Sequence, residues 1–305
     1  MTMRDINQVK KIKKKKGADA IVLDTIVVLV ISAFCLFCLI PFVMLVATSF
    51  ETEINILREG YKLWPSQFTT KAYQMVFDAG QIGKAYGVTI FITIMGTLIS
   101  MLVTIMLAYP LSINKIKYKT QVTFFIYFTM LFNGGLVPTY LLISKYLDMR
   151  NNIWVMIIPV LLNPWNMFMM KNFFRSIPEE LSEAAYIDGA HDLQILRKVI
   201  LPVSVPGLAT IGLFYALGYW NQWYNAMLYI DHSSLYPLQY YIMNLTRSID
   251  AIKEMARMTG QAIGSLPSNS IRMATTVVTI GPIIFIYPFV QKYFTSGIMV
   301  GSIKG

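Results

Sequence analysis

Six long apolar stretches without any Asp, Glu, Lys, Arg or His restrict this chain to a membrane. A helix needs about 20 mostly apolar residues to cross a bilayer, and each stretch is close to that length or longer. The mean hydropathy of +0.54 and the 55% content of apolar residues are typical of a protein that lies largely in lipid. We therefore expect an all-α integral membrane protein with six transmembrane helices, at residues 25–50, 85–114, 120–144, 151–170, 199–230 and 273–291.

The net charge of +10 is distributed unevenly between the two sides of such a protein. Sixteen of the 26 lysines and arginines lie on the side of the amino terminus, which predicts that both termini are cytoplasmic. The lysine-rich run at residues 10–16 could indicate nucleic-acid binding. Its place just before the first span instead favours an orienting tail at residues 1–24 that contacts anionic lipid. We expect no nucleic-acid partner.

The chain lacks the residue patterns that bind nucleotides or metals. It has no G-x-x-x-x-G-K-[ST] loop and no H-E-x-x-H motif. Cys35 and Cys38 have C-x-x-C spacing, which can indicate redox or metal chemistry, but no further cysteine completes a site, so we expect them to pack as apolar side chains. His191 and His232 fall on opposite sides of the predicted membrane. We therefore expect no catalytic residue, metal or cofactor in this chain.

The inner segment at residues 176–202 is predicted to form two short helices. Ser176 and Glu179 have the spacing of a capping box, and Gly189 is a suitable left-handed terminator for the first helix. Asp192 is a suitable cap for the second helix. A purely structural inner loop can have the same pattern, so capping alone does not assign a function.

The same segment resembles a known family. Glu183-Ala184-Ala185, Gly189 after three residues, and later Val199 with Leu201-Pro202 resemble the EAA motif of permease subunits in binding-protein-dependent ABC importers. Val199 stands where isoleucine is usual. Further stretches resemble the sugar-importer branch, in particular the LplC/YtcP-like permeases of polysaccharide-derived oligosaccharide systems: 130–142, 163–168, 218–227, 236–239 and 292–305.

The resemblance implies the type I importer fold, with a permease domain at residues 25–292 in the bacterial cytoplasmic membrane. It implies a second, non-identical permease subunit and two ABC ATPase subunits, which hold the ATP and magnesium. It also implies a solute-binding protein that docks on the outer segments 51–84 and 231–272. Contact with the ATPases is implied for Glu183, Ala184, Ala185, Asp188, Gly189, Leu201 and Pro202, and for the cytoplasmic tail 293–305 through Gly297, Gly301 and Gly305.

Amides and large rings at membrane depth are candidates for the solute pathway, because rings stack on sugar faces while amides bond to hydroxyls. Contacts between helices and aromatic anchoring explain the same residues. The candidates are Tyr215, Tyr219, Trp220, Asn221, Gln222, Trp223, Asn225, Asn163 and Trp165. The competing class is a secondary transporter or channel, which predicts coupling charges within the spans or a self-sufficient pathway. The sequence shows neither.

Overall fold

The computed structural model contains helices, turns and loops, and no strand occurs in the ranges that it describes. This confirms the all-α expectation for that part of the chain. The lysine run, the carboxyl tail with Gly297, Gly301 and Gly305, and the second part of the sixth apolar stretch lie outside the described residues, which are 18–78, 80–113, 116–259, 269–282 and 284.

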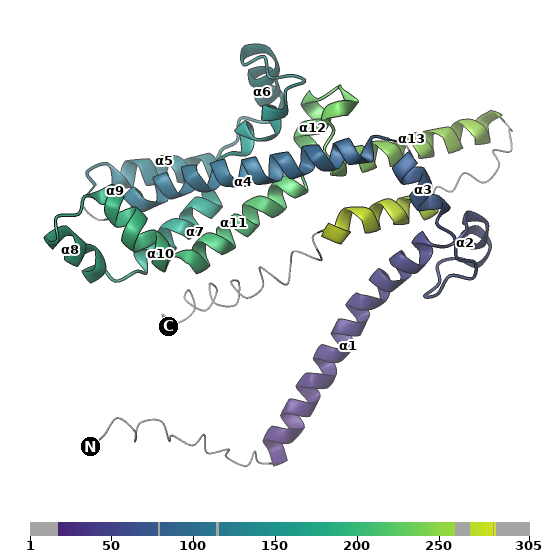
Figure 1. Ribbon diagram of the computed structural model, residues 1–305, viewed down its shortest axis with the longest axis horizontal. Helices are drawn as coiled ribbons and strands as arrows, with labels where there is room; N and C mark the ends of the chain where they lie inside the picture. The colour runs from purple at the N-terminus through teal and green to yellow at the C-terminus, as the bar shows by residue number, and fades with distance from the viewer. Residues whose placement is uncertain (1–17, 79, 114–115, 260–268, 283, 285–305) are drawn as a thin grey trace.

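Three helices pack together as the centre of the molecule (Figure 1). The long α4 (Ile82–Ser112) lies against α7 (Pro164–Arg175) and α11 (Val205–Trp220). Their shared core consists of aliphatic, methionine and tyrosine side chains, and α5 (Lys119–Leu131) covers α7 from one side. One long helix thus supports the elements that carry the predicted pathway residues.

The apolar stretches are less regular than the sequence predicts. Two helices are long and apolar enough to cross a membrane without a break, at Val22–Ser49 and Ile82–Ser112. Three further candidates are pairs of helices with bends of 109°, 52° and 85°, so the described ranges hold up to five spans. The expected six spans are not reached within those ranges, and the third, fourth and fifth apolar stretches are each bent at a break.

Local chemistry explains two of the three bends. In the first pair, α5 is followed by α6 (Leu136–Leu141) and a π-helical turn at Leu142–Tyr146, and Gly135 at the break has a φ of +87° that favours glycine. In the second, the 3₁₀ turns Ile153–Met156 and Ile158–Val160 precede Pro164, which disfavours helical geometry in the residue before it. The third bend separates α10 (Leu201–Val203) from α11.

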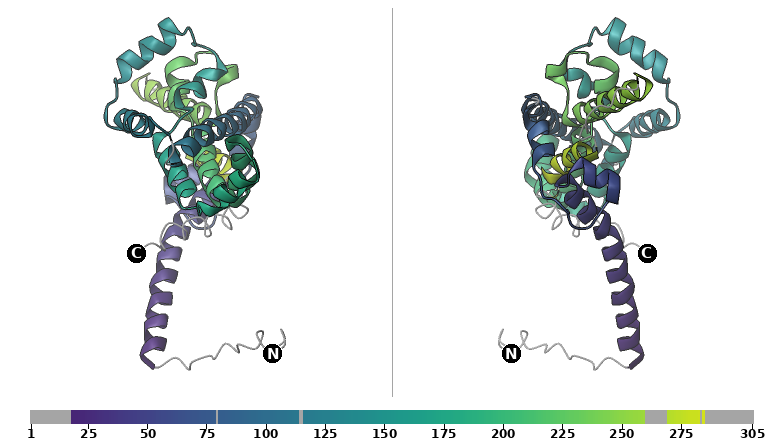
Figure 2. Two further views of the ribbon diagram at one scale, coloured as in Figure 1. Left: turned by 90° about the vertical axis from the view of Figure 1, so that its left-hand side faces the viewer. Right: turned by 90° about the vertical axis from the view of Figure 1, so that its right-hand side faces the viewer.

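The first helix, α1 (Ala18–Ser49), points away from the rest of the described chain (Figure 2). None of the most apolar part of its span is buried, and Cys35 and Cys38 are exposed free thiols on it. Only its carboxyl-terminal end is packed: Ala47, Thr48 and Ser49 are buried, and the Ser49 and Tyr73 hydroxyls are 2.7 Å apart.

Several short helices and one long helix gather at the end of the bundle to which α1 is attached. They are α2 (Glu53–Glu59), α3 (Lys71–Asp78), α12 (Tyr224–Tyr229), a 3₁₀ turn at Ser233–Leu235 and α13 (Leu238–Thr259). The buried Glu53 carboxylate accepts backbone N–H groups of Asn269 at 2.9 Å and Ser270 at 3.1 Å. Residues 269–282 form a further helix, and the positive end of its dipole stabilises the nearby Glu53 carboxylate.

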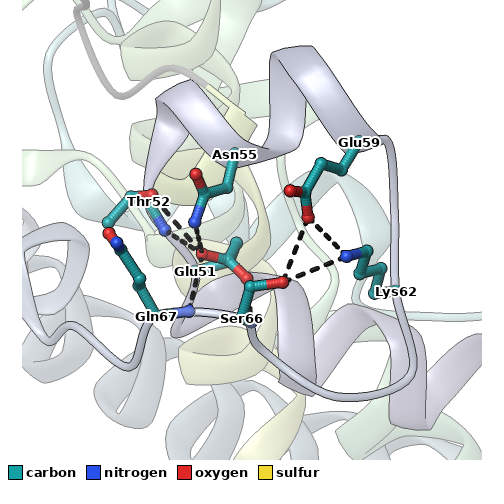
Figure 3. A network of polar contacts seen from close by, with 7 residues as sticks. All are labelled: Glu51, Thr52, Asn55, Glu59, Lys62, Ser66 and Gln67. Carbon is teal, nitrogen blue, oxygen red and sulfur yellow. Dashed lines mark hydrogen bonds and ion pairs between the residues drawn. The ribbon is translucent and has the colours of Figure 1, made fainter.

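A second buried carboxylate, that of Glu51, organises the loop between α2 and α3 (Figure 3). Burial alone would raise the pKa of Glu51, but donated hydrogen bonds outweigh it and hold this pKa below its ordinary value. The donors are the backbone N–H groups of Thr52 at 2.9 Å, Gln67 at 3.2 Å and Ser66, and the side-chain amide of Asn55 at 3.0 Å.

Candidate coupling element and transport pathway

The predicted two-helix element forms an elbow at the opposite end of the bundle from α2 and α3 (Figure 1). Its arms are α8 (Glu180–Ile187) and α9 (Asp192–Ile195), and the second arm continues through a π-helical turn at Leu196–Ile200 into α10. Gly189 is the corner between them, with a φ of +82°.

The corner is a Schellman motif, as the sequence predicts from its glycine. The N–H of Gly189 donates to the carbonyl of Tyr186 at 3.0 Å, and the N–H of Ala190 donates to that of Ala185 at 2.9 Å. These two bonds satisfy carbonyls at the end of α8. A residue with a Cβ would be strained at this φ, so glycine fixes the turn.

Both predicted caps of the elbow are wrong. Ser176 lies at the end of α7 with nearly helical dihedrals, so its hydroxyl reaches back to the Phe173 carbonyl at 2.7 Å, and α8 begins only after Glu179. Asp192 is the first residue of α9, and its carboxylate accepts the Tyr186 hydroxyl. That bond raises the pKa of the Tyr186 hydroxyl to about 12.

The elbow has an inner side that is fixed to the bundle. Ala185 and Tyr186 pack against the core from α8, while Ile195, Leu196 and Ile200 are buried from the second arm. Leu193, one turn before the buried Leu196, is exposed. The motif residues Val199 and Leu201 are half-buried against the core, and Pro202 is exposed.

The other side of the elbow is open and acidic. Glu183, Ala184 and Asp188 are exposed, and Ile187 is 87% exposed at the tip. The elbow therefore presents Ile187, the most exposed of its large apolar side chains, among carboxylates, on a support that is tied to the core by the buried residues behind it.

Four of the predicted pathway residues meet at one cavity of about 170 Å³. They are Tyr215 and Tyr219 on α11, Gln222 just after it, and Asn163 at the start of α7. The cavity is completed by Asn166, Phe214, Gly218 and Val160. Amide groups and aromatic rings therefore share one hollow between α7 and α11.

Buried hydroxyl pairs hold this cavity in shape. The Tyr215 hydroxyl lies 2.7 Å from the Thr104 hydroxyl, and the Tyr219 hydroxyl lies 2.8 Å from the Ser100 hydroxyl, so α11 is bonded twice to α4. Tyr215 also accepts the backbone N–H of Asn163 at 3.1 Å. Ser100 and Thr104 are not among the residues predicted from the sequence. Their spacing of four residues within an apolar span was the available signal, because such hydroxyls commonly bond between membrane helices.

The other pathway candidates lie elsewhere. Trp220 is buried in a second core with α3 and α13, Asn221 accepts the Gln239 amide at 3.2 Å, and Trp223 packs edge-on against Tyr224. Asn225 is half-buried on α12, and Trp165 is 62% exposed on α7. The structure therefore brings together four of the nine and separates the rest.

The elbow, the bundle and the polar cavity match a known class of membrane protein. The family model for the binding-protein-dependent transport system inner membrane component matches residues 87–300, and the chain belongs to this family. The family is a membrane component of transporters and is not itself catalytic.

Two curated relatives come from Bacillus subtilis (strain 168). The polygalacturonan/rhamnogalacturonan transport system permease protein YtcP is 38% identical, with 89% of this chain and 94% of the relative covered. Protein LplC is 36% identical, with 88% and 90% covered. A chain of a bacterial ABC transporter involved in the import of the acidic polysaccharide alginate is similar in structure, with a TM-score of 0.79, 30% identity, and 92% and 99% covered.

Proposed function

We propose that this chain is a permease subunit of an ATP-driven importer for an oligosaccharide derived from a polysaccharide. The family membership, and relatives named for polygalacturonan and alginate transport, support this assignment. The observation that carries it is the elbow at α8 and α9, which combines a rigid inner side with an exposed acidic side.

In the proposed importer, two cytoplasmic ATPase subunits bind ATP and magnesium and contact the elbow. Glu183, Ala184, Ala185, Asp188 and Gly189 form the joint, and Leu201 and Pro202 pass its movement to α11 across the 85° bend. The carboxyl tail, through Gly297, Gly301 and Gly305, adds a second contact. Energy from ATP thereby reaches spans that have no coupling charges of their own.

The small cavity favours a pathway that is shared with a second permease subunit, which we propose is non-identical. Its volume of about 170 Å³ is below the roughly 300–1,000 Å³ usual for small-molecule sites, so it holds at most part of an oligosaccharide. Half of the pathway therefore belongs to the partner. The exposed surface of α1 and the exposed Trp165 are further places where the second permease subunit could make contact.

The proposed topology has six spans in a bacterial cytoplasmic membrane and both termini in the cytoplasm. The outer segments 51–84 and 231–272 then face the solute-binding protein. The Glu51 and Glu53 networks support this role, because they fix the shape of the loop after α2 and tie it to residues 269–270. A fixed loop offers a docking surface at little entropic cost.

Glu183→Arg tests the coupling role in the purified complex. We expect normal membrane insertion and normal assembly of the bundle, with loss of the ATPase stimulation that the solute-binding protein produces. Glu180→Arg is the matched control, since it reverses the same charge on the same exposed helix outside the motif and should keep coupling. Normal uptake by Glu183→Arg would refute the role of the elbow, and uptake by this chain alone in liposomes would refute the importer.

A further inference from the structure

A second cavity, of about 300 Å³, lies between α5 and α7, away from the pathway cavity. It is lined by two lysines, two threonines and two aromatic rings: Lys119, Lys171, Thr120, Thr123, Phe124 and Tyr127. Carboxylates are missing from this lining. Lys119 begins α5, directly after the basic inner loop, and Lys171 lies in the last turn and a half of α7, directly before the elbow.

Each lysine at this cavity donates a hydrogen bond to an uncharged oxygen. The Lys171 ammonium donates to the Thr123 hydroxyl at 3.2 Å and lies 5.7 Å from the centre of the Phe168 ring. Lys119 donates to the Ser112 carbonyl at 3.4 Å. Lys119 and Arg175 are both near enough to Lys171 to act on it electrostatically. An anion in the cavity would relieve this repulsion and gain charge-assisted hydrogen bonds.

An apolar track leads away from the cationic end along α5. Phe124 lines the cavity, and Phe128 and Phe132 follow at four-residue spacing. The ring centres are 6.3 Å apart in the first pair and 4.3 Å in the second, and Phe124 and Phe132 are more than 60% exposed. The surface therefore changes from cations and hydroxyls to bare phenyl rings within about three helical turns.

This order of chemistry matches a phospholipid better than a sugar chain. A phosphate needs cations and hydroxyl donors at one end only, and its acyl chains need an apolar track beyond it. An acidic oligosaccharide carries hydroxyls along its whole length and would leave them without partners on the phenyl rings. Basic hollows between helices at the cytoplasmic side of a membrane are suited to anionic headgroups.

We propose that the cavity at Lys119 and Lys171 binds the phosphate of an anionic phospholipid of the cytoplasmic leaflet, with an acyl chain along Phe124, Phe128 and Phe132. This inference rests on the orientation given under the proposed function. The bound lipid would lie beside α7, about one turn before the end of that helix, where it fixes the spacing of α5 and α7.

The test counts lipids on the intact complex, purified through a tag on this chain and mixed with equal phosphatidylglycerol and phosphatidylcholine. Native mass spectrometry then gives the ratio of the two lipids bound. A basic residue near an anionic lipid contributes about 1 kcal/mol, so Lys171→Gln should lower the preference for phosphatidylglycerol about fivefold. Lys171→Arg should keep it. Lys117→Gln is the matched control, because it removes an exposed lysine of the same inner loop that does not line the cavity.

Competition separates the sources of the anion. Excess inorganic phosphate should leave the bound phosphatidylglycerol in place, because it cannot replace the acyl contacts, and an acidic trisaccharide should also fail to displace it. The proposal would be overturned if Lys117→Gln and Lys171→Gln lowered the preference for phosphatidylglycerol equally. It would also be overturned if either soluble anion displaced the bound phosphatidylglycerol. Lipid counts need no transport, so they can be scored even if the proposed importer function fails.

Discussion

Gly96 allows the closest approach in the centre of the bundle, where the Tyr219 ring of α11 lies against the backbone of α4. A Cβ atom at position 96 would meet three carbons of this ring at 2.6–2.7 Å. Carbon atoms prefer separations of about 3.5–4.0 Å, so the ring would have to move by roughly 1 Å. Tyr219 is only 2% exposed and bonded to Ser100, which leaves it little room to do so.

The predicted cost of Gly96→Ala follows from three contributions. Overpacking of a tight core costs about 1–3 kcal/mol, and disruption of the buried bond between Tyr219 and Ser100 adds about 0.5–1.5 kcal/mol. The better helix propensity of alanine returns at most about 1 kcal/mol. We therefore expect a net loss of about 2 kcal/mol, and a lower melting temperature of the purified complex by several degrees.

Thermal unfolding of the complex in detergent, followed by fluorescence-detected size exclusion, measures this loss. Gly212→Ala is the control on the same pair of helices, because its Cβ would meet only the Met101 sulfur at 4.0 Å, and it should be neutral or slightly stabilising. Combining Gly96→Ala with Tyr219→Leu should cost less than the sum of the two changes, since the smaller side chain makes room. If Gly96→Ala has the same melting temperature as Gly212→Ala, the packing argument is wrong.

Two other changes test the loop between α2 and α3 and the close approach of Gly207 to Phe173. Glu51→Gln should lower the melting temperature at neutral pH. Because the pKa of Glu51 is lowered, its carboxylate stabilises the fold when the pH is above the ordinary pKa of 4.5, and this stabilisation is lost as the pH falls through the lowered pKa. The melting temperature should therefore change less with pH in acid for the variant than for the unchanged protein. Unchanged acid sensitivity would argue against this. Gly207→Ala should destabilise less than Gly96→Ala despite a contact of 2.7 Å to Phe173, because that ring is only half-buried and can turn away; an equal or larger loss would contradict this.

The sequence predicted the features that depend on local chemistry. The glycine corner of the elbow follows from a backbone conformation that glycine adopts without strain, and the all-α architecture follows from apolar stretches of span length. The sequence did not predict the breaks in the third to fifth stretches, because hydropathy averages over a window and does not register where Gly135 or Pro164 redirects the chain. The predicted capping box at Ser176 was wrong because the Ser176 hydroxyl bonds to the helix before it.

The candidate pathway was predicted in part. Residue type alone could not separate Gln222, which lines the cavity, from Asn221 next to it, which bonds to Gln239 on α13. That difference depends on which side of α11 each residue faces once Tyr215 and Tyr219 are bonded to α4. The hydroxyls of Ser100 and Thr104 determine this rotation, and short hydroxyl side chains are weak signals in an apolar span.

The attachment of α1 at a single end has a consequence for assembly. The core between α4, α7 and α11 closes without any side chain from the main part of α1, and Ser49 and its neighbours anchor only the carboxyl-terminal end of that helix. The bundle can therefore complete its own folding while the first helix still lies free in lipid. In such a chain α1 is a helix attached at one end only. The pairing of subunits then becomes a separate, later step that depends on how many copies of each subunit are present in the membrane.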